Sequence, residues 1–298
     1  MIRSEEVDYT PFENYLGKPR PCAVCGASDK KESWARSGVF HAVRCRGCGL
    51  VWIDPFLTEA GFAKYYTDYI AFRLKNKKKM EQRSRMYELD GDFLRLFVQR
   101  GELLDVGCSA GFFLEKLGDG FSKHGIEKDP AAVALARERN PAIGAVIQEG
   151  ELGKDDLIPG SYDVITMRGV IEHLPDPRMA VRRVAELLRP DGWYYVTATP
   201  NTDSFCAEAY REKWNQFDPI QHIYCFSAKT LGRLCGEFGL KLEAQAYPYL
   251  ETPYASPEED YAQLRRDLQL IQQGRRNEVG RSPAFWGNMM TLIFRKNA

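Results

Sequence analysis

Long apolar runs are missing from this 298-residue sequence: none approaches the ~20 residues that a membrane-spanning helix needs. The N-terminal segment MIRSEEVDYTPFENY also lacks the apolar centre of a signal peptide. Net charge is missing too, because 41 basic residues balance 41 acidic ones, so no overall attraction to polyanions is built in. No Pro/Gly-rich linker or internal repeat interrupts the chain. We therefore expect a soluble, cytoplasmic protein with one large core and a small additional module.

Glycines break an apolar segment, LLDVGCSAGFFL (residues 103–114), which predicts a strand, a tight turn and a helix. Gly107 and Gly111 permit positive φ and a close approach of a ligand to the backbone. The spacing D-x-G-x-x-x-G differs from the dinucleotide fingerprint G-x-G-x-x-G, whose middle glycine makes room for a pyrophosphate. Asp105 would repel phosphate and attract an ammonium group. The segment therefore predicts a site for a nucleoside without a pyrophosphate, and S-adenosylmethionine fits that description.

An acid follows at the distance expected for a ribose ligand: Glu127, in KHGIEKDP, lies 20 positions beyond Gly107. Further on, the predicted strands AIGAVIQ, YDVITMRG and WYYVTAT alternate with helical patterns such as PRMAVRRVAELLRP. This alternation predicts an α/β fold with a doubly wound, mostly parallel sheet and ligands at its carboxyl edge. The alternative is that the glycines only form turns and Glu127 is a surface acid.

Six segments in this order resemble the class I S-adenosylmethionine-dependent methyltransferases, over about two thirds of the chain from Leu103 onward. They read LLDVGCSAGFFL, GIEKD, GEL, YDVITMRGVIEHLPDP, LLRPDGWYYVTATPN and QHIYCFSAKTLGRLCGEFGL. The resemblance implies that Asp105, Gly107, Gly111 and Glu127 hold the methionine and ribose parts of the cofactor, Glu151 and Leu152 the adenine, and Met167 and Arg168 the cleft floor. It also implies cofactor contacts for Cys108, Phe112 and Lys128.

Four of the eight cysteines form two C-x-x-C pairs, Cys22/Cys25 and Cys45/Cys48, with 19 residues between the pairs. Paired thiolates at such spacing are typical of zinc sites, and a glycine after each second cysteine lets the backbone curl toward sulfur. The spacing predicts a zinc ribbon with hairpin strands between the pairs. Four sulfur ligands leave no open coordination position, so the zinc would be structural. The alternative is four buried or disulfide-linked cysteines.

Two histidines are candidates for a general base. His173 follows the predicted fourth strand of the core, and His222 falls in the long aromatic and polar segment at about 200–225, where the resembled family builds its acceptor pocket. For His173, ordering of the loop at a helix start is the alternative, and for His222 a structural role is equally open.

The sequence predicts three parts: a zinc-ribbon module (1–56), a helical connector or lid (57–100) and the core (101–298). In the connector, seven of the thirteen residues 73–85 are Lys or Arg. This stretch predicts either a patch for RNA or a phosphorylated substrate, or a solvated helix face. Tyr65, Tyr66 and Tyr69 precede it and either line the cleft or pack on the ribbon.

Three functions follow from these features. The first is methylation of a small-molecule or glycan acceptor at a sugar hydroxyl, because a four-cysteine ribbon joined to this core resembles sugar methyltransferases of polysaccharide or natural-product pathways. The second is methylation of an RNA base, although the N/D-P-P-Y/F loop usual for amino-group methylation is replaced by MRGVIEHL. The third is a non-catalytic binding module. The sequence makes no prediction of oligomeric state.

Overall fold

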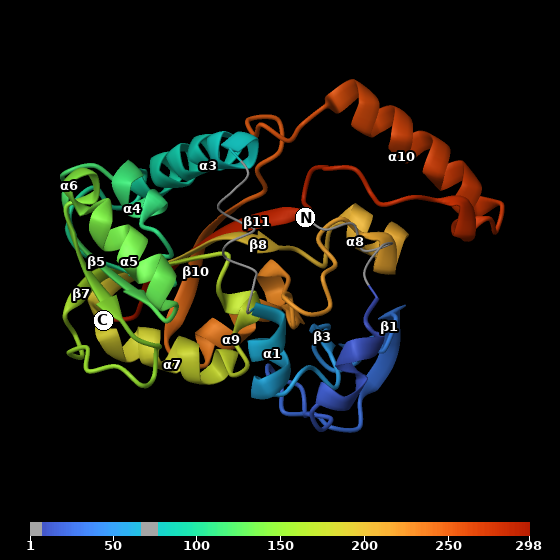
Figure 1. Cartoon of the computed structure of the whole chain (residues 1–298), viewed down its shortest axis with the longest axis horizontal. Helices are drawn as coiled ribbons and strands as arrows, with labels where there is room; N and C mark the ends of the chain where they lie inside the picture. Colours follow the sequence, from blue (N-terminus) through green and yellow to red (C-terminus); the bar gives the residue numbers. More distant parts are fainter. Residues whose placement is uncertain (1–7, 67–76) are drawn as a thin grey trace.

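The computed structural model describes residues 8–66 and 77–298, with side chains in the second segment described from residue 83 (Figure 1). The strands are β1 (Lys31–Ser37), β2 (Phe40–Cys45), β3 (Val51–Ile53), β4 (Gly101–Val106), β5 (Phe121–Glu127), β6 (Ala145–Glu149), β7 (Tyr162–Arg168), β8 (Leu188–Pro200), β9 (Tyr224–Cys225), β10 (Leu240–Ala246) and β11 (Met289–Lys296). The α-helices are α1 (Glu59–Tyr66), α3 (Lys77–Arg95), α4 (Phe112–Lys116), α5 (Pro130–Glu138), α6 (Asn140–Ile143), α7 (Pro177–Leu187), α8 (Phe205–Tyr210), α9 (Ala228–Gly236) and α10 (Pro257–Gln272). Short 3-10 helices are η1 (Thr10–Tyr15), η2 (Ile171–His173), η3 (Arg211–Lys213) and η4 (Arg276–Glu278).

A seven-stranded sheet forms the core, in the order β10-β11-β8-β7-β4-β5-β6. Strands β4 to β8 pair in parallel, whereas β11 inserts antiparallel between β8 and β10. The chain runs outward from β4 to β6 and then crosses back to β7, so the strand order reverses between β4 and β7. Open sheets of this kind bind ligands at the carboxyl ends of the strands beside such a reversal. The predicted doubly wound, mostly parallel fold is confirmed.

The local sequence explains why these elements form. The central strands β4 and β7 contain continuous buried runs, as expected when helices cover both faces of a parallel sheet. Asp129 caps α5 by accepting a hydrogen bond from the Ala132 N–H, and Pro130 occupies its first turn. The helix predicted from PAAVALARERN thus begins at its proline.

Two apolar clusters lie on opposite faces of the sheet. One contains residues of α3, α4 and α5, and the other contains residues of α7 and α9 together with the N-terminal strands. Figure 1 shows α3, α4 and α5 grouped on one side and α7 and α9 on the other. The second cluster joins the N-terminal module to the core in one continuous packed interior.

The N-terminal module forms a four-stranded sheet, β1-β2-β3-β9. Strands β1 and β2 make the predicted hairpin and β3 adds antiparallel to it. The fourth strand, β9, comes from the core segment after residue 200: Val51 pairs with Cys225 and Trp52 with Tyr224. The predicted boundary at residue 56 therefore separates strands of one sheet, and the module and the core share backbone hydrogen bonds.

Part of the predicted connector falls outside the described residues. Tyr69 and residues 73–76 lie there, and the side chains of the basic stretch are described only from residue 83, so the contacts expected of these residues stay predictions. Tyr65 is described, and its ring lies 6.2 Å from that of Phe12 in η1, on the ribbon side.

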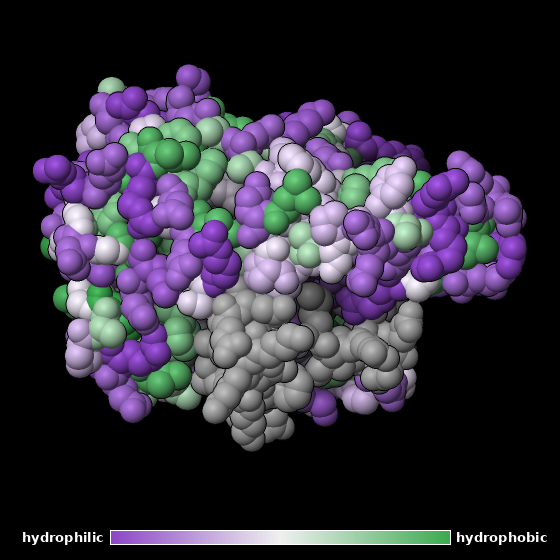
Figure 2. Space-filling view, turned by 90° about the horizontal axis from the view of Figure 1, so that it is seen from above, coloured by the Kyte–Doolittle hydropathy of each residue, from purple (hydrophilic) through white to green (hydrophobic). Residues whose placement is uncertain are grey.

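The face drawn in Figure 2 carries hydrophobic residues scattered among hydrophilic ones. Within residues 8–66 and 77–298, no helix combines the length and apolar character that crossing a membrane requires.

Candidate active site

Asp105 lies near the end of β4, beside the strand reversal, and is only 2% exposed. Its Oδ1 accepts a hydrogen bond of 2.6 Å from the Thr166 hydroxyl of neighbouring β7. Burial raises the pKa of Asp105 to about 7, although Thr166 and the charge of Arg168 act in the opposite direction. The charged form of this carboxyl group therefore carries a desolvation cost, which a cationic ligand would offset.

The loop after β4 depends on its glycines. Gly107 and Gly111 have φ of +72° and +75°, a region that L side chains rarely adopt. A Cβ at Gly107 would lie 2.8 Å from Val170, and one at Gly111 would collide with Ile143. The two glycines therefore make room for the side chains of Val170 and Ile143, which pack against the loop at these positions.

Glu127 ends β5 and fixes this loop. One carboxylate oxygen accepts the Ser109 N–H at 3.0 Å and the other accepts the Asp129 N–H at 2.9 Å. Each carboxylate oxygen has a second lone pair, so both can still accept hydrogen bonds from a diol. Glu127 thus lies where the sequence predicts a ribose ligand, and it also orders the glycine loop.

The other predicted cofactor residues differ in their surroundings. Leu152 and Cys108 are buried, whereas Glu151 and Lys128 are exposed, and Glu151 pairs with Lys154 at 3.0 Å. Phe112 stacks on Tyr87 with ring centroids 6.3 Å apart.

Met167 and Arg168, the predicted cleft floor, are both held by core partners. Met167 is fully buried, and its sulfur accepts a hydrogen bond from the Tyr194 hydroxyl. The Arg168 guanidinium donates to Asp90 of α3 at 2.7 Å and lies 4.3 Å from the centroid of the Tyr87 ring. Arg168 therefore joins α3 to the end of β7.

A buried carboxyl group and two imidazoles meet after β7. The candidate ligand atoms of Glu172, His173 and His222 all lie within 4.8 Å of one another, and the two imidazole rings are 5.1 Å apart. Glu172 is 1% exposed, and its Oε2 accepts a hydrogen bond of 3.2 Å from the Thr199 hydroxyl. Burial raises the pKa of Glu172 to about 7, while the charge of His222 acts to lower it. Both predicted base candidates thus lie in one cluster.

The tautomer of His222 follows from its surroundings. Its Nδ1 lies 2.7 Å from the carbonyl oxygen of Gln216, and a carbonyl only accepts, so Nδ1 carries the proton in the neutral ring. Nε2 then holds a lone pair that can accept a proton from a substrate.

The four predicted metal ligands also come together. The sulfur atoms of Cys22 and Cys48 are 3.4 Å apart, those of Cys25 and Cys45 are 3.5 Å apart, and all four lie within 4.8 Å of one another. A tetrahedral zinc with bonds of about 2.3 Å requires sulfurs about 3.8 Å apart, so the group fits a zinc ion. All four cysteines are free thiols. The alternative of disulfide-linked cysteines is therefore wrong for this structure.

The glycines after the second cysteines of the two pairs do not turn their N–H groups toward sulfur as the sequence predicts; Gly47 is the residue whose N–H donates to a sulfur, that of Cys45, at 3.3 Å. Gly26 and Gly49 have φ of +74° and +89°, and their N–H groups donate to the carbonyls of Cys22 and Cys45. Burial raises the pKa of both Cys22 and Cys48, the latter to about 11. Burial disfavours the deprotonation of these thiols, and a bound cation would favour their thiolate forms.

Several site residues were absent from the sequence-based prediction: Asp90, Thr166, Glu172 and the Gln216 carbonyl. Glu172 carried a signal, since it directly precedes a base candidate in VIEHLPDP. No local sequence pattern indicated a role for Asp90, because its partner, Arg168, lies 78 residues further along the chain.

Comparison with known proteins gives consistent results. Residues 70–245 match a family model described as a methyltransferase domain. Over 151 residues the chain is 28% identical to the ubiquinone biosynthesis O-methyltransferase of Chromobacterium violaceum, covering 48% of this chain and 65% of that protein. The same-named protein of Bordetella bronchiseptica is 33% identical over 108 residues, 35% of this chain and 45% of its own length. The chain thus spans about half the length of these curated relatives.

Two solved structures share the fold. A chain in the complex of the Haloferax volcanii Trm112 methyltransferase activator with its methyltransferase superposes with a TM-score of 0.57 at 14% identity, covering 76% of this chain and 97% of that one. A SAM-dependent methyltransferase from Thermotoga maritima gives a TM-score of 0.53 at 16% identity, covering 79% and 98%.

Proposed function

This chain belongs to the methyltransferase-domain family, and from that premise we propose that it transfers a methyl group from S-adenosylmethionine to a hydroxyl of a small-molecule acceptor, a sugar or glycan. The observation that supports hydroxyl chemistry is the cluster of Glu172, His173 and His222 at the carboxyl edge of the sheet. The matched relatives named O-methyltransferases agree with oxygen as the acceptor atom. The polar and aromatic segment at about 200–225, which carries His222, supports a hydroxylated acceptor.

The cofactor would occupy the glycine loop. When bound, S-adenosylmethionine supplies an electrophilic methyl group on a sulfonium. The buried carboxyl group of Asp105 would accept from its ammonium group, and Glu127 would accept from its ribose hydroxyls. Glu151 and Leu152 would flank the adenine.

The chain's own groups then align the acceptor and remove its proton. The acceptor oxygen would take the methyl group, and the electron pair of the broken carbon–sulfur bond would stay on sulfur. His222 accepts the hydroxyl proton at Nε2, because its Nδ1 proton is held by the Gln216 carbonyl. Glu172, whose charge interacts with that of His222, would stabilise the imidazolium that forms.

Zinc in this proposal is structural. Four thiolates would complete its coordination and leave no position for a substrate or water.

The test is turnover of S-adenosylmethionine with purified zinc-loaded protein against sugars, nucleotide sugars, glycans and transcripts. His222→Ala should lower turnover about 10²- to 10⁴-fold with unchanged cofactor affinity, the usual effect of losing a general base. His124→Ala is the matched control, because that histidine lies in the middle of β5 beside Tyr162, with ring centroids 5.6 Å apart.

His173→Ala is assayed in parallel as the second base candidate. Near-normal turnover in both His222→Ala and His173→Ala on the true acceptor would exclude base catalysis by histidine. Loss of cofactor affinity or of folding in His222→Ala would assign that residue a structural role instead.

A further inference from the structure

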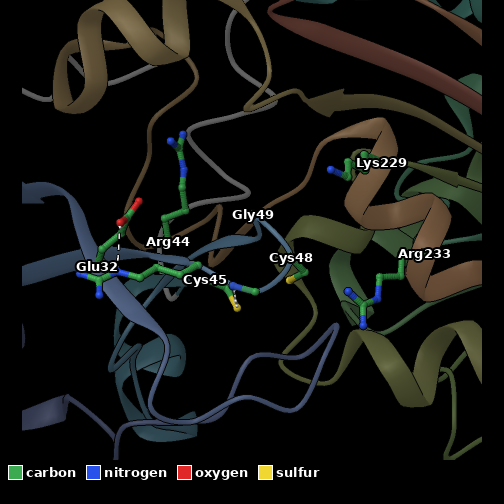
Figure 3. Close-up of a pocket in the computed structure, with 9 residues that line it drawn as sticks. Glu32, Arg44, Cys45, Cys48, Gly49, Lys229 and Arg233 are labelled. Atoms are coloured by element: carbon green, nitrogen blue, oxygen red, sulfur yellow. Dashed lines mark hydrogen bonds and ion pairs between the residues drawn. The ribbon is translucent and has the colours of Figure 1, made fainter.

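A cavity of about 430 Å³ opens between the second cysteine loop and α9 (Figure 3). Its lining comes from both parts of the chain: Glu32, Arg44, Cys45, Arg46, Gly47, Cys48 and Gly49 from the ribbon, and Lys229 and Arg233 from α9. Four of these side chains are cationic and one is acidic. The cavity is separate from the cluster around His222 and from the glycine loop.

The four cations differ in their partners. Arg44 pairs with Glu208, and Arg46 pairs with Glu32 at 3.2 Å. Neither Lys229 nor Arg233 forms an ion pair with an acidic residue in the described part of the chain. In Figure 3 both extend from α9 toward the loop that carries Cys48. Two cations that lack internal partners and face one cavity favour a ligand with at least two negative charges.

One glycine of the lining, Gly49, borders open space. Gly49 has φ of +89°, and nothing lies within 4 Å of the position that a Cβ would take there. At Gly49 the loop therefore presents backbone to open space, while Arg46 and Cys48 add side chains to the lining.

Strand pairing connects the cavity to the proposed catalytic group. Gly49 precedes Val51 of β3, Val51 pairs with Cys225 of β9, and His222 lies three residues before Cys225. This path is at most about 22 Å long in extended chain. A single acceptor with an anionic group at one end and a hydroxyl at the other could span it.

We propose that this cavity binds the phosphate or diphosphate group of the methyl acceptor, so that the acceptor is a phosphate-linked sugar. The inference rests on the proposed function for the sugar hydroxyl, but the anion site itself does not. Lys229 and Arg233 supply the charges that the anion neutralises, and Arg44 and Arg46 lie beside it.

The first experiment uses pyrophosphate as the probe, with calorimetry on the full zinc-loaded chain. Binding with a dissociation constant of ~1 mM or tighter is expected, weakening as salt is added. Lys229→Gln and Arg233→Gln should each weaken it about tenfold or more, whereas Lys241→Gln, an exposed lysine paired with Glu243, should not. Binding that is absent, or equal in all four proteins, overturns the proposal.

A competing role for these cations is to neutralise the zinc cluster, because four thiolates around Zn²⁺ carry two net negative charges. That role predicts faster zinc loss to a chelator in Lys229→Gln, with pyrophosphate affinity unchanged. This pair of results would overturn the proposal.

The second experiment compares a sugar and its diphosphate-linked form as methyl acceptors. The linked form should have the lower KM, and Lys229→Gln should raise that KM about tenfold while leaving the KM of the unlinked sugar unchanged. Equal KM values for both acceptors, in wild type and variant alike, would overturn the assignment of the anion to the acceptor. Failure of every acceptor contradicts the proposed function instead, and pyrophosphate binding then decides the anion site.

Discussion

At the scale of single residues, two buried carboxyl groups work against stability. Burial raises the pKa of Asp105 and of Glu172 to about 7 each, from ordinary values near 4. Between pH ~4 and ~7 the folded protein therefore holds protons that the unfolded chain has released, so the free energy of unfolding falls as pH rises through this window. Sites prepared for a charged ligand commonly carry such a cost.

Asp105→Asn should therefore stabilise the free protein at pH 8 by roughly 1–4 kcal/mol and have little effect at pH 5, where Asp105 is already neutral. The same variant should lose affinity for S-adenosylmethionine, because the amide cannot neutralise its ammonium group. Urea unfolding at the two pH values measures the first effect and calorimetry the second. Equal changes in unfolding free energy at pH 5 and pH 8 would contradict a raised pKa.

Glu127→Ala should weaken S-adenosylmethionine binding by roughly 1–3 kcal/mol, the effect of removing a partly buried hydrogen-bonding partner. Glu149→Ala is the matched control, since Glu149 is exposed and pairs in register with Glu127 at the end of the next strand. Calorimetry with S-adenosylmethionine and with its demethylated product measures both variants. Unchanged affinity in Glu127→Ala would mean that another residue binds the ribose.

At the scale of elements, strand β9 connects the N-terminal module, which carries the four-cysteine cluster, to the proposed base. It pairs with β3 of the ribbon, and the Ile53 N–H donates to the carbonyl of Ile223, the residue after His222. Arg178 of α7 adds hydrogen bonds to the carbonyls of Ala23 and Val24, within the first cysteine loop. Order in the cysteine cluster should therefore be transmitted to the segment that holds His222.

We expect one zinc per chain in protein purified without added metal, measured by elemental analysis. Its removal by a chelator should increase amide hydrogen exchange in residues 50–53 and 223–226, while β4 stays protected. Cys206→Ala, outside the cluster, should keep the metal, whereas Cys48→Ala should lose it. Less than half an equivalent of zinc, with all four thiols freely titratable in the native protein, would refute a zinc site.

The sequence predicted individual helices and strands better than the long-range contacts between them. Hydrophobic periodicity and the glycine spacing placed the glycine loop and the strand before it, because those signals are local. The pairing of β9 with β3 was not predicted, since two residues of strand leave almost no periodic pattern. The Arg168–Asp90 ion pair was missed for a related reason: a buried charge finds its partner through packing, and periodicity carries no trace of it.

At the scale of the whole molecule, the ribbon and the core are one packing unit. A single apolar cluster contains Trp34 and Trp52 of the ribbon together with Ile165 and Val196 of the central sheet. Although the sequence predicts a module boundary at residue 56, the apolar cluster continues across that boundary. Stability should therefore be shared between the two parts.

Zinc-loaded protein should accordingly unfold in one calorimetric transition, with the van't Hoff enthalpy close to the calorimetric enthalpy, although chains of this length often unfold in steps. Chelated protein should unfold in two, because the ribbon loses its metal cross-link while the seven-stranded sheet keeps its own core. Differential scanning calorimetry before and after metal removal measures both profiles. Two separate transitions in the zinc-loaded protein would mean that the shared apolar cluster does not couple the unfolding of the two parts. In that case β9 would unfold with the ribbon while the seven-stranded sheet remained folded.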